Sequence, residues 1–176
     1  MIQFVADAML GRLTRWLRIL GYAVFYDQAL SDDQILALAQ DKNGILLTRD
    51  YELHKRAQHQ DMRSLYLRGV TVLDKLVEIA TRYSISFHLD ASISRCAKCG
   101  DHLQQVDKTT IQTEIPAGTF SHFSAFWRCE TCGKVYWQGS HWNRISQTVA
   151  HVTNILNRST LDVNSGKSDE NEVSNV

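Results

Sequence analysis

The cysteines of this chain of 176 residues form two C-x-x-C pairs, a spacing typical of metal ligands. The four residues are Cys96, Cys99, Cys129 and Cys132. A glycine follows each pair and permits the positive φ that such a turn tends to need. Two such turns direct four thiolates at one point and complete the tetrahedral shell of Zn²⁺ without an open position. We therefore expect a structural zinc site; a redox-active dithiol is the alternative, which the matched pair of turns disfavours.

Aspartates follow two of the expected strands, and two more aspartates open the helix after another strand. Asp7 follows the apolar run 2–6, Asp50 follows the run 45–48, and Asp32 and Asp33 open a helix after the second strand. Because parallel strands end at one edge of a sheet, we expect these carboxylates to converge. Gathered carboxylates repel one another unless a cation lies among them, and Mg²⁺ prefers such oxygen ligands. A bound Mg²⁺ can activate water for attack on a phosphodiester.

Some of these aspartates have a second interpretation. Residues 31–34 fit a capping box, so Asp32 or Asp33 could serve only the helix N-terminus. Asp50 could cap the helix that follows it. Asp7 has no obvious capping partner, because it follows an apolar first strand. The whole set supports a metal site better than any single member does.

Three arginines, Arg12, Arg15 and Arg18, recur every three residues on the helix behind Asp7. They could form a solvated face opposite the apolar stripe of the helix. They could instead form a strip that binds phosphate beside the metal. We expect Arg12 and Arg15 to contact phosphate and Arg18 to be only solvated. Arg49 is a further candidate, because an aspartate follows it directly.

Aromatic residues gather around the second cysteine pair. They are Trp127, Tyr136, Trp137 and Trp142. Aromatic rings can stack on unpaired bases, although packing of a small core is the more common role. His141 lies beside Trp142, after the turn at residues 139–140. We predict that His141 faces the aspartate site and contacts substrate.

Residues 1–90 alternate strand and helix signals, which implies an α/β domain with a parallel sheet and helices on its faces. Residues 91–142 lose the helical period and form the expected zinc ribbon. Residues 143–158 have apolar residues at helical spacing and predict an amphipathic C-terminal helix. Residues 159–176 are rich in Ser, Asn, Asp and Glu, and we expect a disordered tail.

The formal net charge is +0, so charge alone predicts no partner. The ribbon segment is mildly basic and the tail acidic, which is compatible with nucleic acid near the ribbon. Neither a Walker loop nor G-x-G-x-x-G occurs, which disfavours nucleotide-dependent enzymes. No apolar run approaches membrane-spanning length, and the N-terminus has no basic n-region or cleavage site. We therefore expect no signal peptide and a cytoplasmic location.

Several segments together resemble a known family. They are residues 4–13, 16–22, 31–33 and 47–50, both cysteine pairs and residues 136–142. The chain resembles the Mut-seven C-terminal ribonuclease domain family. The resemblance implies a PIN-like three-layer α/β sandwich with a parallel sheet, followed by a zinc ribbon and a C-terminal helix. It also implies a ribonuclease that uses Mg²⁺ or Mn²⁺ and has RNA as its partner.

The resemblance supports Asp7, Asp32 and Asp50 as the metal-binding and catalytic set. It ranks Asp32 above Asp33, because the family's acid directly follows the serine of this motif. PIN-like nucleases usually have a fourth acid later in the chain, and Asp74 is a candidate by position only.

Two other functions stay open. A non-catalytic module that binds RNA or the ribosome would keep the acids as vestiges. A phosphotransfer or phosphatase domain would need a phosphate-accepting acid with a placed Lys or Thr. No lysine follows the fourth strand, and the ribbon has no role in that scheme.

Overall fold

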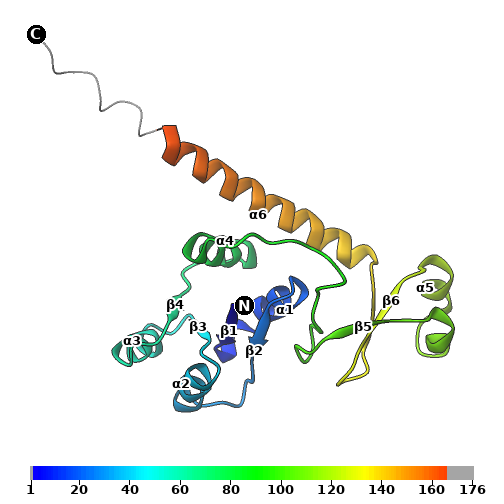
Figure 1. The fold of residues 1–176 in the computed structure, drawn as a ribbon, viewed down its shortest axis with the longest axis horizontal. Coiled ribbons are helices and arrows are strands. Elements are labelled where there is room, and N and C mark those ends of the chain that lie inside the picture. Colours follow the sequence, from blue (N-terminus) through cyan, green and yellow to red (C-terminus); the bar gives the residue numbers. More distant parts are fainter. Residues whose placement is uncertain (1, 166–176) are drawn as a thin grey trace, which may run out of the picture.

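The computed structural model describes residues 2–165, and its centre is a parallel sheet with the strand order β2-β1-β3-β4 (Figure 1). The strands are β1 Gln3–Ala6, β2 Ala23–Phe25, β3 Ile45–Thr48 and β4 Ser64–Tyr66. β1 pairs with β2 and β3, and β3 pairs with β4. The predicted α/β class and parallel sheet are therefore confirmed.

Helices cover both faces of this sheet. They are α1 Gly11–Ile19, α2 Asp32–Asp41, α3 Tyr51–His59 and α4 Val72–Tyr83. Alternate residues of β1 reveal the two faces. Phe4 and Ala6 lie in one apolar cluster with α1 and α4, whereas Val5 lies in another with α2 and α3. The sheet is thus the middle of three layers, as expected for a parallel sheet buried on both faces.

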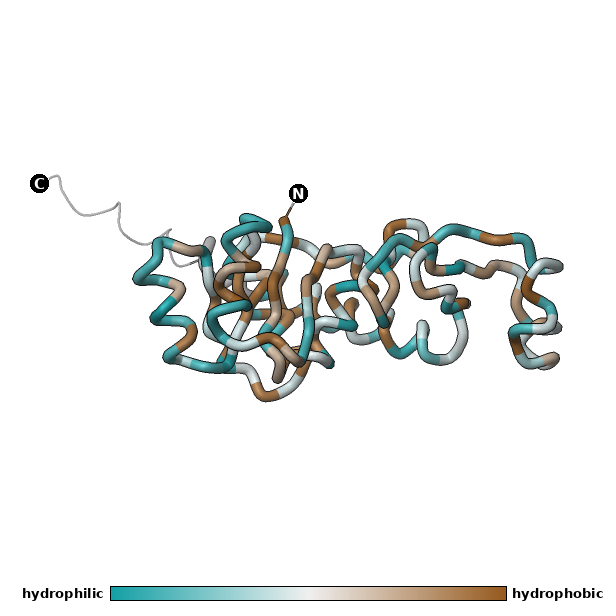
Figure 2. Tube along the Cα trace, turned by 90° about the horizontal axis from the view of Figure 1, so that it is seen from below, coloured by the Kyte–Doolittle hydropathy of each residue, from teal (hydrophilic) through white to brown (hydrophobic). Residues whose placement is uncertain are grey.

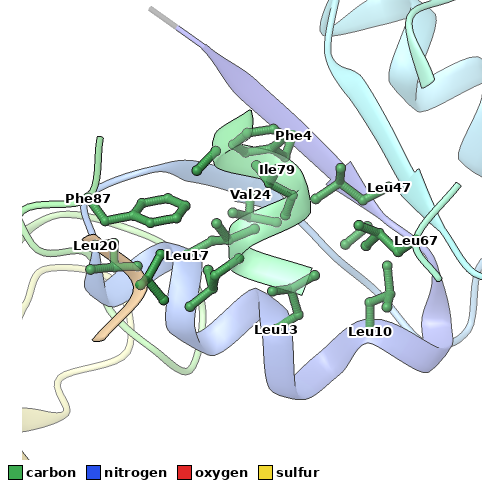
Figure 3. Packing of buried hydrophobic residues seen from close by; sticks show 14 of the residues in the cluster. Phe4, Leu10, Leu13, Leu17, Leu20, Val24, Leu47, Leu67, Ile79 and Phe87 are labelled. Atoms are coloured by element: carbon green, nitrogen blue, oxygen red, sulfur yellow. The ribbon is translucent and has the colours of Figure 1, made fainter. Parts of the chain in front are cut away.

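A single apolar stripe holds α1 and the preceding 3-10 turn η1, Ala8–Leu10, against the sheet. The buried residues of the stripe are Leu10, Leu13, Leu17 and Leu20. In Figure 3 they lie in one cluster with Leu47 of the sheet and Ile79 of α4, and Leu20 lies beside Phe87 at the other end of the helix. Burial of each leucine contributes about 1.5–3 kcal/mol. The stripe therefore fixes α1 and the arginines on its other side relative to the carboxyl edge of the sheet.

After α4, three antiparallel strands form a second, smaller sheet in the order β5-β6-β7. They are β5 Leu103–Val106, β6 Phe126–Cys129 and β7 Val135–Trp137. The first cysteine pair precedes β5, and the second begins at the end of β6. Two cysteine turns on antiparallel strands agree with the expected ribbon.

The interval between the cysteine pairs is long because it contains its own small unit. The unit holds η2, Lys108–Ile111, and α5, Ala117–His122. Ile111, Ile115 and Phe126 form its core. Figure 2 shows this segment at one end of the molecule, away from the sheet domain. The sequence predicts a zinc ribbon over residues 91–142 but not these helices.

The helix α6, Ser140–Ser165, returns from the ribbon and crosses α4 (Figure 1). Ile145, Val149 and Val152 join the cluster of α1 and α4, as their spacing predicts. The helix is longer at both ends than the expected 143–158, and it includes residues 159–165 of the expected tail. No glycine or proline occurs between Ser140 and Ser165, so nothing in the sequence ends the helix earlier.

The rest of the expected tail, residues 166–176, lies outside the described residues. Within residues 2–165, neither α6 nor another helix combines the length and the apolar character needed to cross a membrane.

Candidate active site and cysteine metal centre

Asp7 lies at the carboxyl edge of the sheet, directly after β1, and is only 8 % exposed. The hydroxyl of Thr48, the last residue of β3, donates a hydrogen bond to Asp7 Oδ2 at 2.8 Å. The same hydroxyl oxygen accepts the backbone N–H of Asp50 at 2.9 Å. Because β1 and β3 are adjacent and parallel, one buried hydroxyl connects the two acidic residues.

Asp50 also caps α3, as the alternative interpretation of the sequence expects. Its Oδ1 accepts the backbone N–H groups of Glu52 at 2.8 Å and Leu53 at 3.1 Å. Within the described residues, its other carboxylate oxygen, Oδ2, accepts no hydrogen bond. Capping of α3 and binding of a cation are therefore compatible roles for Asp50.

Asp32 and Asp33 open α2, but they are not its caps. The capping box consists of Ser31 and Gln34, whose side chains each accept the other's backbone N–H. Arg56 of α3 reaches both acids: its Nη1 lies 3.4 Å from Asp32 Oδ2, and its Nη2 pairs with Asp33. Asp32 is thus held by an arginine of the neighbouring helix, and its side chain is 52 % exposed.

Among the described residues, only the four cysteines bring three or more possible metal-binding atoms within 4.8 Å of one another. Asp7 and Asp50 share the sheet edge, but the carboxylate of Asp32 does not converge on them. Mg²⁺ commonly binds through one or two carboxylates and keeps several waters or phosphate oxygens. The pair Asp7 and Asp50 fits that mode, whereas direct binding by Asp32 requires its release from Arg56.

Asp74, the positional candidate for a fourth acid, serves the N-terminus of α4. Its Oδ2 accepts the backbone N–H of Thr71 at 2.8 Å. Hydrogen bonds from the backbone and side chain of Thr71 lower the pKa of Asp74. Glu78, which the sequence does not single out, reaches from α4 to the chain after β4, where it accepts the N–H groups of Arg68 and Gly69.

A cleft of about 1000 Å³ lies between α1, the start of α4, the ribbon and the first turns of α6. Arg12, Arg15 and His141 are exposed and line it. Its wall begins at Met9, close to Asp7 in the chain, although Asp7 itself does not line it. Arg49 is exposed beside Asp50 and lies outside this lining.

The four cysteines fit a zinc ion. The Sγ atoms of Cys96 and Cys132 are 3.5 Å apart, and those of Cys99 and Cys129 are 3.3 Å apart. Four Zn–S bonds of about 2.3 Å place the sulfur atoms of a tetrahedron roughly 3.8 Å apart. The glycines after the pairs, at 100 and 133, have φ of 89° and 69°, the positive values expected of such turns. The cluster could therefore hold Zn²⁺.

Tyr136 of β7 contacts the first cysteine pair, with its hydroxyl 3.1 Å from Cys96 Sγ. Burial raises the pKa of the Cys96 thiol, but hydrogen bonds from Tyr136 and from backbone N–H groups outweigh burial and lower the pKa to about 6. Burial raises the pKa of Cys129 to about 12. Because metals bind thiolates, the tyrosine favours the form of Cys96 that a zinc site requires.

The sequence model of the Mut7-C RNAse domain matches residues 2–149, which contain the parallel sheet, the ribbon and the first part of α6. The chain belongs to the Mut7-C RNAse domain family. Membership confirms the resemblance found in the sequence. No curated protein and no solved structure matches the chain.

In this Mut7-C RNAse domain, Arg18 is buried, so the expectation that it is only solvated is wrong. Its Nε and Nη2 donate to the carbonyl oxygen of Val24 at 3.2 and 2.9 Å, and its Nη1 donates to that of Lys98 at 3.0 Å. Desolvation lowers the pKa of Arg18, opposed by the nearby Cys99 and Cys96. Three residues along an α-helix rotate the side-chain direction to about 60° short of a full turn. Arg18 is therefore rotated about 120° from Arg12, onto the side that meets the ribbon.

Arg18 is the centre of a junction between the sheet domain and the ribbon of the Mut7-C RNAse domain. The backbone N–H of Arg95 donates to the Arg18 carbonyl at 2.8 Å, and the Ser94 hydroxyl donates to the Ile19 carbonyl at 2.6 Å. A Cβ on Gly100 would lie 2.8 Å from Arg18 Nε. The first cysteine turn is thus attached directly to the C-terminus of α1.

Proposed function

We propose that this Mut7-C RNAse domain is a metal-dependent ribonuclease that hydrolyses RNA phosphodiester bonds at the carboxyl edge of its sheet. The Mg²⁺ or Mn²⁺ ligands in this proposal are Asp7, Asp32 and Asp50. The residues proposed to contact RNA are Arg12, Arg15, Arg49 and His141. The observation that carries the proposal is the Thr48 hydroxyl, which donates to the Asp7 carboxylate and accepts the backbone N–H of Asp50. Family membership supports RNA as the substrate.

The side chains at this edge have different roles. Asp7 is held in place before any ligand binds, because it is buried and accepts the Thr48 hydroxyl. Asp50 offers Oδ2, since α3 engages only Oδ1. A bound divalent ion polarises the phosphate and lowers the pKa of a coordinated water. The exposed guanidinium of Arg49 is suited to a phosphate oxygen.

Asp32 joins the metal site by changing its partner. Its ion pair with Arg56 is half exposed, and pairs of this kind contribute only about 0–1 kcal/mol. At equal distance a divalent ion would attract this carboxylate about twice as strongly as the guanidinium does, so Asp32 could leave Arg56 to join the site.

The three-layer arrangement supports a PIN-like classification of the sheet domain. Acids follow the adjacent strands β1 and β3, and a further acid opens α2. The ribbon has a structural zinc ion in this proposal, because four thiolates leave no position for water. It aids RNA binding through the cleft that it shares with α1.

The test is cleavage of labelled RNA in Mg²⁺ or Mn²⁺ by Asp7→Asn and Asp50→Asn variants. Each change keeps the size of the side chain and removes its charge, and we expect activity to fall at least about 100-fold, beyond the range typical of outer-shell residues. Asp41→Asn is the matched control, because Asp41 is exposed at the far end of α2 and pairs with Lys42. Omission of Mg²⁺ and Mn²⁺ should abolish cleavage by the zinc-loaded parent protein.

Circular dichroism must establish that the variants are folded. Equal cleavage by the Asp7→Asn, Asp50→Asn and Asp41→Asn proteins would exclude the proposed catalytic edge.

A non-catalytic RNA-binding module is the second candidate, and the Asp32–Arg56 ion pair favours it. In that case the acids bind no divalent ion and Arg56 neutralises Asp32 permanently. The parent protein would then bind RNA with a strong dependence on salt and would not cleave it in any divalent metal. The same assay therefore separates the two functions.

A further inference from the structure

The cleft is built from three parts of the chain that are far apart in sequence. One wall is α1, a second is the start of α4, and the ribbon and α6 complete it. From α6, His141, Trp142 and Ile145 line the cleft, at the spacing of one helix face. Figure 1 shows that α6 leaves the ribbon and passes above α1 toward α4. The position of the cleft depends on the complete fold, not on the ribbon alone.

The charged side chains that line the cleft are basic. Its cations are Arg12, Arg15, Lys75, Arg95, Lys134 and Arg144. No Asp or Glu occurs among the described residues that line it. Arg12, Arg15 and Arg144 are exposed, and within the described residues none of them forms a salt bridge. The neutral chain therefore concentrates positive charge in this cleft, which suits a polyanion.

The lining is also aromatic. All four tryptophans of the chain contribute to it: Trp16, Trp127, Trp137 and Trp142. Each is half-buried, so that part of the ring packs on protein and part stays accessible. Unpaired bases stack on such rings, whereas bases within a duplex have no free face to offer.

The basic surface continues around α1. Arg12 and Arg15 also line a second cavity of about 810 Å³, together with Lys98 and Tyr26. Both cavities begin at η1, which follows Asp7. A strand held by these arginines can therefore run toward the carboxyl edge of the sheet.

We propose that this cleft is a binding site for an unpaired segment of RNA, with bases against the tryptophans and phosphates against Arg12, Arg15 and Arg144. The inference rests on the proposed ribonuclease function for its substrate, and it adds a site separate from the aspartate edge. A flexible single strand follows a cleft enclosed by helix and ribbon. The aromatic rings of the lining favour RNA over an acidic peptide, because binding of an acidic peptide would need only the positive charge of the cleft.

The experiment measures binding by the zinc-loaded protein in buffer without Mg²⁺ or Mn²⁺, where the proposed cleavage cannot occur. The probe is a fluorescent oligouridine of about 12 nucleotides, within the site sizes of single-strand-binding domains. Trp142→Ala should weaken binding about fivefold or more, the effect of losing about 1 kcal/mol or more of stacking. Trp142→Phe should restore much of the affinity. Quenching of tryptophan fluorescence by the unlabelled strand should accompany binding.

Arg144→Ala tests the phosphate contacts, and Arg158→Ala is its matched control. Both arginines are exposed on α6, but only Arg144 lines the cleft. Arg144→Ala should weaken binding severalfold and reduce the salt dependence by about 0.7 in slope, the value for one phosphate of a single strand. Arg158→Ala should leave both unchanged.

The inference is overturned if Trp142→Ala and Arg144→Ala bind as the parent does, if a duplex of the same sequence binds better, or if a polyglutamate peptide competes equally well. Because no turnover is measured, these outcomes are independent of catalysis. Binding in the cleft without cleavage in Mg²⁺ or Mn²⁺ would reject the proposed activity and retain this site.

Discussion

The sheet domain and the ribbon are held together by different interactions. In the sheet domain, two apolar clusters cover both faces of the sheet, and leucines of α1 fill much of one of them. The ribbon and its inserted helices bury only a small cluster around Ile111, Ile115 and Phe126. The four cysteines and the junction at Arg18 supply what this core lacks. An apolar core therefore stabilises one part, whereas the other depends on polar contacts and on four cysteines that could hold a metal ion.

Removal of zinc should produce the largest effect. It should unfold the ribbon and leave the sheet domain folded. Structural zinc contributes about 10–16 kcal/mol of binding free energy in zinc-finger peptides. After chelation, we expect the amides of β5–β7 to lose protection from hydrogen exchange, while those of β1 and β3 keep it. Added Zn²⁺ should restore protection. Loss of protection in both sheets to the same extent would contradict this expectation.

Leu17→Ala should destabilise the sheet domain by about 2–5 kcal/mol, since it leaves a cavity among fully buried neighbours. Chemical denaturation of the zinc-loaded protein measures the change in unfolding free energy. Met9→Ala is the control: Met9 is 65 % exposed and should change stability by about 0.5 kcal/mol or less. Similar losses for the two variants would show that α1 is not part of the main core.

Arg18→Met should have the smallest of these effects, about 1–3 kcal/mol, and should act at the junction. The methionine fills much of the volume but leaves the carbonyl oxygens of Val24 and Lys98 without their donor. We expect faster hydrogen exchange around residues 94–100 with little change in β3. Arg82→Met, on the exposed side of α4, is the control. Unchanged exchange around 94–100 would show that Arg18 does not fix the ribbon.

The sequence predicts the parts that depend on local pattern or on strand order. The apolar runs predict β1 and β3, and their parallel order suffices to bring Asp7 and Asp50 to one edge. The C-x-x-C spacing predicts the cysteine cluster. Each of these inferences depends only on the pattern of apolar residues or on the spacing of a motif.

Contacts between elements are not encoded in such patterns. Arg18 donates to a carbonyl 80 residues away, and nothing in the sequence of α1 identifies that partner. The ion pair of Asp32 with Arg56 depends on how α2 and α3 pack, so the sequence places the acid but not its neighbour. The inserted helices between β5 and β6 are short and lack a long apolar period.

The return of α6 to α4 makes the sheet domain discontinuous in sequence, with the ribbon inserted between its two segments. Ile145, Val149 and Val152 complete a cluster whose other buried members come from the first ninety residues. During synthesis, that cluster stays open until the ribbon and half of α6 have left the ribosome. Nascent chains should therefore gain protease resistance in a single late step rather than domain by domain.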